Sequence, residues 1–224
     1  MKRFKFHIIY FLFLAVLTIN STAQIELGIY AGPSVLQFSG DKPEYSVYRP
    51  TPGLTAGAIF NFNITEDILI SLEPGFSLNN ITVQTIDTLN YLIFSKLEYK
   101  DTAVVSLNFT QLPLLVRIIS DNQRFVFTSG LELLYLLNSY VDNGVDKKRI
   151  TADFQKFNLA AQFGFGYIIP IKKSHLSLEF RYSQSLLNWS NNDQETSFVP
   201  RIKARGFQFI VGWSIPVSKD KQTK

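Results

Sequence analysis

Apolar side chains alternate with polar or small side chains over most of the chain after residue 24. The clearest case runs from Phe157 to Ile169, where every second residue is apolar and Gln162, Gly164 and Gly166 are among the residues between. Successive side chains of a β-strand point to opposite faces of the sheet, so this period of two predicts a strand with one apolar and one polar face.

The same alternation predicts eight strands, within residues 25–31, 54–64, 68–78, 112–118, 125–137, 157–169, 176–182 and 207–215. No segment of this region has a sustained helical period, so the fold class is all-β. Tight turns at 64–67, 120–123 and 170–174 alternate with long polar stretches at 39–52, 79–105, 139–152 and 189–201. This asymmetry and the even strand number predict an eight-stranded antiparallel up-and-down transmembrane β-barrel, with short periplasmic turns and long extracellular loops.

The charged residues of the eight stretches separate by face. The apolar faces carry no Asp, Glu, Lys or Arg, which is typical of a surface in contact with lipid. The opposite faces carry Glu26 near the start and six further charges that we expect to fill the lumen, namely Glu73, Arg117, Glu132, Lys156, Glu179 and Arg181. We expect Glu73, Arg117, Glu179 and Arg181 to form one ion network that closes the barrel. A soluble, lipocalin-like periplasmic barrel, with these charges in water, is the alternative.

Glycine and aromatic residues also favour the membrane barrel. Nine glycines lie on the polar faces, where a narrow lumen needs small side chains: Gly28, Gly32, Gly57, Gly75, Gly130, Gly164, Gly166, Gly206 and Gly212. Aromatic residues near the two ends of the strands predict two interfacial girdles. We expect Phe62, Phe125, Tyr167 and Trp213 in one girdle, and Phe76, Tyr135, Tyr182 and Trp189 in the other.

The first residues have the pattern of an export signal. Lys2, Arg3 and Lys5 precede an apolar run from Ile8 to Leu17, and small side chains at Ser21 and Ala23 suit cleavage after Ala23. We therefore expect a signal peptide at 1–23, a barrel domain at 24–217 and a polar tail at 218–224. Loss of the three basic residues lowers the net charge from +4 to 4 − 3 = +1, which gives no reason to expect nucleic-acid binding.

Several short motifs resemble a known family. They are Leu27-Gly28-Ile29-Tyr30-Ala31-Gly32, Ser71-Leu72-Glu73-Pro74-Gly75-Phe76 and Leu112-Pro113-Leu114-Leu115-Val116-Arg117, together with the signal ending Ser21-Thr22-Ala23-Gln24. These stretches look like the small outer-membrane β-barrel proteins of Bacteroidota, the PorT-like group. The resemblance implies an eight-stranded barrel in the bacterial outer membrane without catalytic residues. One member of that group is associated with the type IX secretion and gliding machinery.

Residues that support catalysis or metal binding are scarce. The chain has no cysteine, and after the signal peptide its one histidine is His175, so no zinc, iron or other cofactor site is expected. A hydrolase using His175 with Ser174 or Ser177 and Glu179 would need that group near the outer leaflet, whereas the topology puts it at the periplasmic rim. We therefore expect a non-enzymatic barrel.

Two functional classes remain open for such a barrel. The first is a structural or adaptor component whose loops and turns bind other envelope or secretion proteins. The second is a small transport or ligand-binding barrel. Outer-membrane lipid and lipopolysaccharide are expected partners, and the basic run Lys147-Lys148-Arg149 is either a solvated loop tip or a contact for lipopolysaccharide phosphates.

Overall fold

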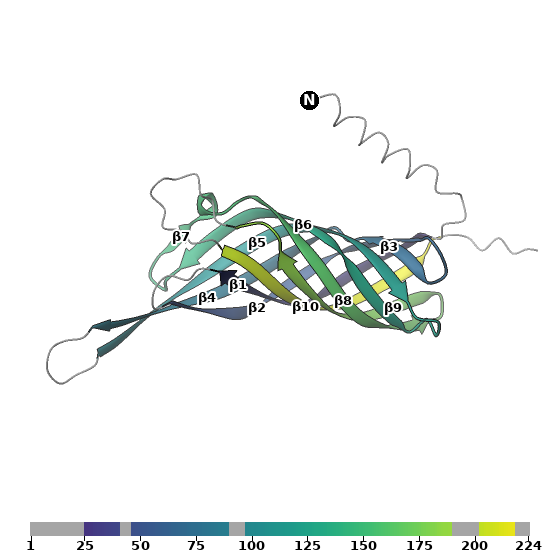
Figure 1. Ribbon diagram of the computed structural model, residues 1–224, viewed down its shortest axis with the longest axis horizontal. Coiled ribbons are helices and arrows are strands. Elements are labelled where there is room, and N and C mark those ends of the chain that lie inside the picture. Colours follow the sequence, from purple (N-terminus) through teal and green to yellow (C-terminus); the bar gives the residue numbers. More distant parts are fainter. Residues whose placement is uncertain (1–24, 41–45, 90–96, 190–201, 218–224) are drawn as a thin grey trace, which may run out of the picture.

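The computed structural model describes residues 25–40, 46–89, 97–189 and 202–217, which form one antiparallel β-sheet rolled into a barrel (Figure 1). The signal peptide and polar tail expected at 1–23 and 218–224 lie outside the described residues. The strands are β1 (Ile25–Gly40), β2 (Ser46–Asn63), β3 (Ile68–Leu72), β4 (Gly75–Leu89), β5 (Leu97–Ile119), β6 (Phe125–Asp142), β7 (Lys147–Arg149), β8 (Phe157–Ile171), β9 (Ser174–Ser185) and β10 (Ile202–Pro216). One short 3-10 helix, η1, spans Thr151–Asp153. The described segments contain no helix long and apolar enough to cross a membrane.

Eight strands close the ring. β3 and β4 keep one register against β5, from Leu69 opposite Arg117 to Phe76 opposite Thr110, so they act as a single strand interrupted at 73–74. β1 pairs with β2 on one side and with β10 on the other, which joins the two ends of the sheet. Closure leaves the ring no free edge with unpaired backbone groups. The predicted all-β, eight-stranded antiparallel fold is confirmed.

The strands extend further than the apolar alternation indicates. β4 and β5 remain paired as far as Leu89 opposite Leu97, and their hairpin projects beyond the ring at the left of Figure 1. Much of the stretch 79–105 is therefore strand, and the prediction of one long polar loop there was wrong. Its β-branched residues, such as Ile81, Thr82 and Val83, favour extended backbone, and Ile81 is also buried in the lumen.

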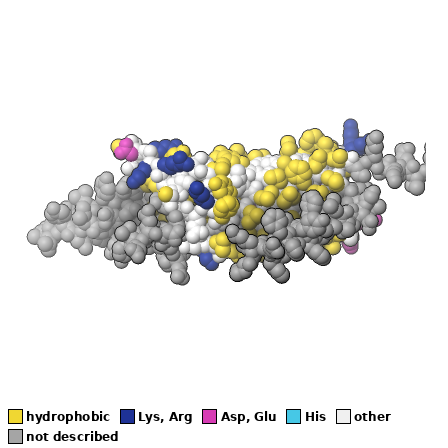
Figure 2. All heavy atoms as spheres, turned by 90° about the horizontal axis from the view of Figure 1, so that it is seen from above, with side chains coloured by type: hydrophobic (Ala, Val, Ile, Leu, Met, Phe, Trp, Pro, Cys, Tyr) yellow, Lys and Arg dark blue, Asp and Glu magenta, His cyan; other side chains and the backbone are white. Residues whose placement is uncertain are grey.

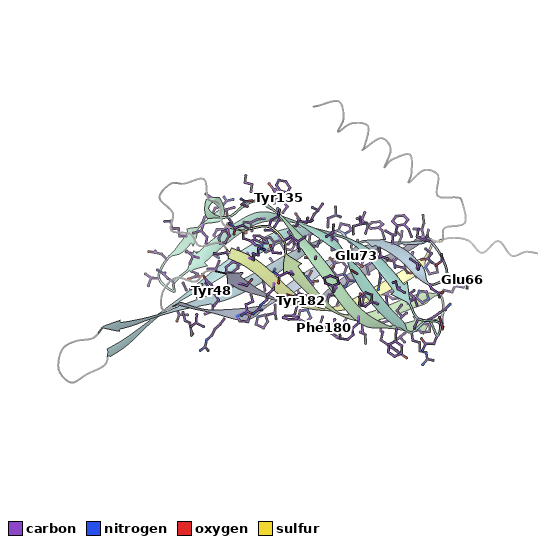
Figure 3. All side chains as sticks on the ribbon, viewed as in Figure 1. Tyr48, Glu66, Glu73, Tyr135, Phe180 and Tyr182 are labelled. Carbon is purple, nitrogen blue, oxygen red and sulfur yellow. The ribbon has the colours of Figure 1, made fainter. Side chains whose placement is uncertain are left out.

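Two ends of the barrel are distinguished by their connections. The short-turn end carries the tight connections after β2, β5 and β8, and both described chain ends, Ile25 and Val217. The long-loop end carries the β4–β5 hairpin, the β6–β7 hairpin and η1. In Figure 3, Glu66 lies at the short-turn end and Tyr48 lies toward the long-loop end.

The wall presents its apolar side chains outward. Leu114, Phe165 and Trp213 are each about half exposed or more, at 56%, 66% and 49%, whereas the inward Thr128 and Gln162 are fully buried. Figure 2 shows the resulting hydrophobic surface along the barrel. This distribution is the inverse of that in a water-soluble domain, where large apolar side chains are mostly inside.

The lumen near the long-loop end is filled by an apolar cluster. Its buried members are Phe38, Ile81, Val105, Leu107, Phe109, Leu136, Phe154, Trp189, Ile202 and Ala204. Trp189 was predicted in an interfacial girdle, and that prediction was wrong: its ring is 1% exposed and packs edge-on against Phe109, with centroids 4.9 Å apart. Trp189 follows the end of β9, so the alternation of that strand does not decide which way its side chain points.

Glycine makes room for the charged residues of the lumen. Gly164 and Gly166 on β8 lie opposite Arg181 and Glu179 on β9. A Cβ atom at Gly164 would lie 2.8 Å from Cγ of Arg181, and one at Gly166 would lie 2.5 Å from Cγ of Glu179. Both distances are too short for carbon atoms, so a larger residue at either position would displace a charged side chain.

We expect Gly164→Val to lower the free energy of unfolding by about 1–3 kcal/mol, the usual range for overpacking a filled interior. The measurement is the urea unfolding midpoint of the barrel in detergent. Ala161→Val is the matched control because Ala161 lies on the outward face of the same strand. Equal midpoints for the two variants would contradict the close packing of β8 against Arg181.

Candidate functional site in the barrel lumen

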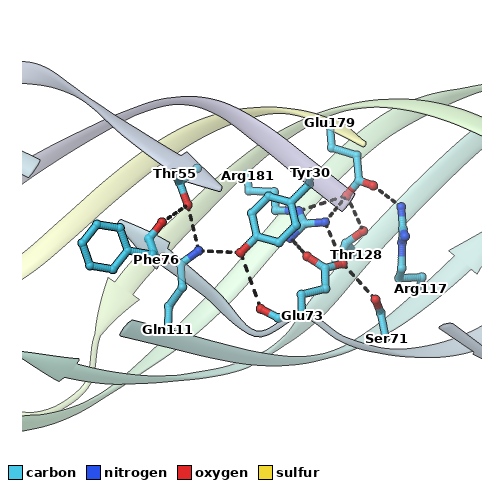
Figure 4. Close-up of polar contacts among 10 residues, drawn as sticks. All are labelled: Tyr30, Thr55, Ser71, Glu73, Phe76, Gln111, Arg117, Thr128, Glu179 and Arg181. Atoms are coloured by element: carbon cyan, nitrogen blue, oxygen red, sulfur yellow. Dashed lines mark hydrogen bonds and ion pairs between the residues drawn. The ribbon is translucent and has the colours of Figure 1, made fainter. Parts of the chain in front are cut away.

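Arg181 lies at the centre of the lumen, in contact with two carboxylates. Its Nη2 donates hydrogen bonds to Oε1 of Glu73 at 3.1 Å and to Oε2 of Glu179 at 2.8 Å, and its Nε donates to Oε2 of Glu179 at 3.0 Å (Figure 4). Nη1 also bonds Glu73. None of the three side chains is more than 1% exposed.

Glu73 and Glu179 reach Arg181 from different sides. Glu179 is two residues before Arg181 on β9, so both side chains point inward from one strand. Glu73 lies at the junction of β3 and β4, where Pro74 interrupts the backbone ladder, and it reaches Arg181 from across the ring. The ion pair therefore connects opposite walls of the barrel.

Three further side chains complete the hydrogen bonding of the two carboxylates. Arg117 from β5 forms an ion pair with Oε1 of Glu179, and Thr128 from β6 donates to Oε2 of Glu179 at 3.3 Å. Ser71 from β3 donates to Oε1 of Glu73 at 2.8 Å. The structure thus brings Glu73, Arg117, Glu179 and Arg181 together in what we call the ion cluster. A buried ion cluster is stable only where such additional hydrogen bonds offset the loss of hydration.

A neutral layer of hydrogen bonds adjoins the ion cluster. Nε2 of Gln111 donates to the Tyr30 hydroxyl at 2.9 Å and to Oγ1 of Thr55, also at 2.9 Å. The Tyr30 hydroxyl donates in turn to the backbone oxygen of Glu73 at 3.5 Å. These three residues carry no charge, so the sequence gives little sign of the layer beyond their inward positions on alternating strands.

Glu132 and Lys156 differ from the other predicted lumen charges. Glu132 points inward from β6 and is 1% exposed, but its Oε1 accepts no hydrogen bond from any described residue. Lys156 is exposed and lies just before β8, so the prediction that it points into the lumen was wrong. β8 begins only at Phe157, so Lys156 lies before the strand and need not follow its alternation of inward and outward side chains.

The charges of the lumen do not balance among the described residues. Arg117 and Arg181 supply two positive charges, and Glu73, Glu132 and Glu179 supply three carboxyl groups. Glu132 is the carboxyl group that forms no ion pair with a described residue, because Arg117 and Arg181 pair with Glu73 and Glu179. Glu132 is therefore the least well compensated charged group in the described lumen.

Cavities lie on both sides of the ion cluster. A cavity of about 440 Å³ opens at the short-turn end, with Arg117, Asn61, Glu26 and His175 in its wall. A chamber of about 30 Å³ lies next to Glu132 and is bounded toward the long-loop end by residues including Trp189. The ion cluster separates the two spaces.

His175 is paired with Glu26, whereas the Glu179 of the predicted hydrolase group is paired with Arg117 and Arg181. Nδ1 of His175 lies 3.6 Å from Oε1 of Glu26, which also accepts hydrogen bonds from Asn61 and Ser214 through Oε2. The hydroxyl of Ser174 donates instead to the backbone oxygen of Ile171 at 2.9 Å. Over the described part of the chain, no three His, Cys, Asp or Glu residues are grouped so that they could hold a metal ion.

Comparison with known proteins gives a family and a set of similar folds. A family model described as outer membrane protein beta-barrel domain matches residues 19–191. No curated protein matches the sequence.

Among solved structures, Ail, the attachment invasion locus protein of Yersinia pestis, is 10% identical, with 85% of this chain and 98% of that chain covered and a TM-score of 0.45. Neisserial surface protein A is 12% identical, with 84% and 96% covered and a TM-score of 0.44. OprG from Pseudomonas aeruginosa is 13% identical, with 87% and 96% covered and a TM-score of 0.43.

We expect Arg117→Ala to destabilise the barrel by about 3–5 kcal/mol, because it leaves Glu179 in the interior with one of its two cations removed. The change in the free energy of unfolding is measured by urea titration, with circular dichroism as the signal. Lys147→Ala in the exposed β6–β7 hairpin serves as the control and should change the midpoint very little. Similar midpoints for both variants would show that Arg117 lies in water.

In contrast to Arg117→Ala, the variant Glu132→Gln is not expected to lower the stability of the barrel. Replacing this carboxyl group by a neutral amide of similar size removes a charge that forms no ion pair with a described residue and whose Oε1 accepts no hydrogen bond. The urea midpoint at neutral pH should therefore rise or stay unchanged, whereas Glu179→Gln should lower it. A marked fall for Glu132→Gln would mean that this carboxylate has an essential partner.

Proposed function

This chain belongs to the outer membrane protein beta-barrel domain family, and we propose that it is a non-enzymatic barrel that binds other envelope or secretion proteins at its two ends. Its place in the cell is the outer membrane. The soluble, lipocalin-like alternative is wrong, because the family is one of the outer membrane and the wall is apolar on its exposed side.

The filled lumen is the observation that carries this proposal. The ion cluster spans the ring from Glu73 to Arg181, and the apolar cluster with Trp189 and Phe109 fills the lumen toward the long-loop end. An ion or small solute would have to displace both a set of satisfied ion pairs and a packed apolar layer. A narrow barrel filled in this way supports a structural or adaptor role better than transport.

The orientation of the barrel is part of the proposal. We place the short turns in the periplasm and the long-loop end outside, which is the usual arrangement of outer-membrane barrels. Export through a signal peptide at 1–23 and the kinship with the PorT-like proteins of Bacteroidota belong to the same proposal and are supported by the sequence motifs. A role in a secretion or gliding machinery would place the partner proteins at these ends.

A ligand-binding barrel is the second candidate. The cavity of about 440 Å³ at the short-turn end favours it, since its wall contains polar groups such as Asn61 Oδ1 and Arg117 Nε that have no partner among the described residues. Such a ligand would be bound from one side and would not pass through the barrel.

In planar bilayers, the wild-type protein should show no steady, well-defined conductance steps. The triple variant Glu73→Ser/Arg181→Ser/Trp189→Ala removes the cross-lumen pair at constant net charge together with the largest side chain of the apolar cluster. It should raise the conductance if the barrel stays folded, as judged by heat-modifiable gel mobility. Regular conductance steps in the wild type would favour transport.

Single cysteines test the orientation, because the chain has none of its own. Asn143→Cys, at the tip of the β6–β7 hairpin, should react with a membrane-impermeant maleimide on whole cells. Lys173→Cys, in the turn between β8 and β9, should react only after the outer membrane is opened. The reverse pattern would invert the proposed topology.

A further inference from the structure

The outer wall of β10 changes from apolar to cationic toward the long-loop end. Its exposed, outward side chains are, in order, Lys203, Arg205, Phe207, Phe209, Val211, Trp213 and Ile215. Successive outward residues of a strand are about 7 Å apart, so the first cation lies one such step beyond the last aromatic ring. The change from an apolar to a polar outer surface is the sign of a membrane–water interface.

On the neighbouring strands β1 and β9, the outward side chains change from apolar or aromatic to amide at the same rows. Phe207 packs against Tyr182 of β9, with ring centroids 5.2 Å apart. One step closer to the long-loop end, Arg205 lies opposite Gln184 on β9 and Gln37 on β1, and its Nε donates to Oε1 of Gln37 at 3.2 Å. An apolar or aromatic row (Val35, Phe207 and Tyr182) is thus followed by a row of one cation and two amides across three adjacent strands.

A further exposed cation lies next to an aromatic pair at the long-loop end. Phe157 on β8 packs against Tyr135 on β6 with centroids 4.8 Å apart, and the exposed Lys156 immediately precedes Phe157. We call Lys156, Lys203 and Arg205 the cationic collar. No carboxylate of the described residues lies within 4.0 Å of a collar cation. The ion pairs among the described residues involve only the cations Arg117, His175 and Arg181. Figure 2 shows Lys and Arg gathered toward the long-loop end, beside the hydrophobic surface.

The short-turn end has no such excess of positive charge. Its described turns carry three exposed acids and three exposed bases: Glu66, Asp67, Asp121, Arg124, Lys172 and Lys173. A general preference for charged residues at the ends of strands would give both ends a similar mixture. The collar is therefore specific to one interface.

We propose that the cationic collar binds the phosphate groups of lipid A, the anchor of the lipopolysaccharide in the outer leaflet. Its cations lie just beyond the apolar wall, where the phosphates of a lipid packed against Phe207 and Phe157 would be. Arginine can bind a phosphate through two parallel hydrogen bonds, and lysine offers a mobile point charge. This inference rests on the proposed orientation, since lipid A lies in the outer leaflet only.

The test uses the full barrel, refolded in a neutral detergent and titrated with diphosphorylated lipid A, with binding followed by thermophoresis. Lys203→Gln/Arg205→Gln should weaken the apparent affinity about tenfold or more, because each interfacial cation contributes to the attraction of an anionic lipid. Lys172→Gln/Lys173→Gln is the matched control, with the same loss of charge at the other end, and should change the affinity less than about twofold. Circular dichroism and heat-modifiable mobility verify that both variants fold.

Three outcomes would overturn the proposal: equal weakening by both double variants, equal affinity for lipid A stripped of its phosphates, or equally tight and collar-dependent binding of phosphatidylglycerol. The last would show that the collar recognises any anionic lipid. The binding assay in detergent does not depend on orientation, whereas the cysteine labelling does. Collar-dependent binding together with inverted labelling would therefore overturn the proposed orientation and the outer-leaflet lipid, while the phosphate site itself would remain.

Discussion

The buried guanidinium of Arg181 is the group on which the interior of the barrel depends. A charge removed from water is tolerated only if it is neutralised and hydrogen-bonded where it lies. Arg181 obtains this from Glu179 on its own strand and from Glu73 on the opposite wall. Gly164 leaves the space in which the Arg181 side chain passes β8.

The same requirement extends through the carboxylates to the rest of the ring. Glu179 needs Arg117 and Thr128, and Glu73 needs Ser71, so one buried cation fixes the relative positions of the strands β3, β5, β6 and β9. The outer surface of the ring has a different requirement: it must carry no charge and no unpaired backbone group, because hydrocarbon solvates neither. Together the two constraints account for a wall that is apolar outside, closed by the pairing of β1 with β10, and polar inside.

Local sequence pattern predicts which way a strand residue points, and no more than that. It assigned Leu114 to the outside and Arg117 to the lumen on the same strand, because alternation is a local property of extended backbone. The sequence predicts that Glu73 and Arg181 both point into the lumen, but whether they meet depends on the shear of the barrel, which is not visible along one strand. Trp189 and Lys156 were misplaced because each lies just beyond a strand end. The β4–β5 hairpin was missed because its sequence lacks a sustained alternation of apolar and polar residues, although Ile81 and Val105 contribute to the apolar cluster.

A barrel that is filled inside and covered by lipid outside has only its two ends and the adjoining interfaces free for recognition. Those ends are unlike. The short-turn end offers an open polar cavity near His175 and Glu26, and the long-loop end offers paired hairpins above a cationic wall. The ion cluster and the apolar cluster join opposite walls between them, so the ring cannot flatten or shear without breaking buried ion pairs. A rigid ring of this kind keeps two chemically different ends at a fixed separation across the membrane, which is the property that the proposed adaptor role requires.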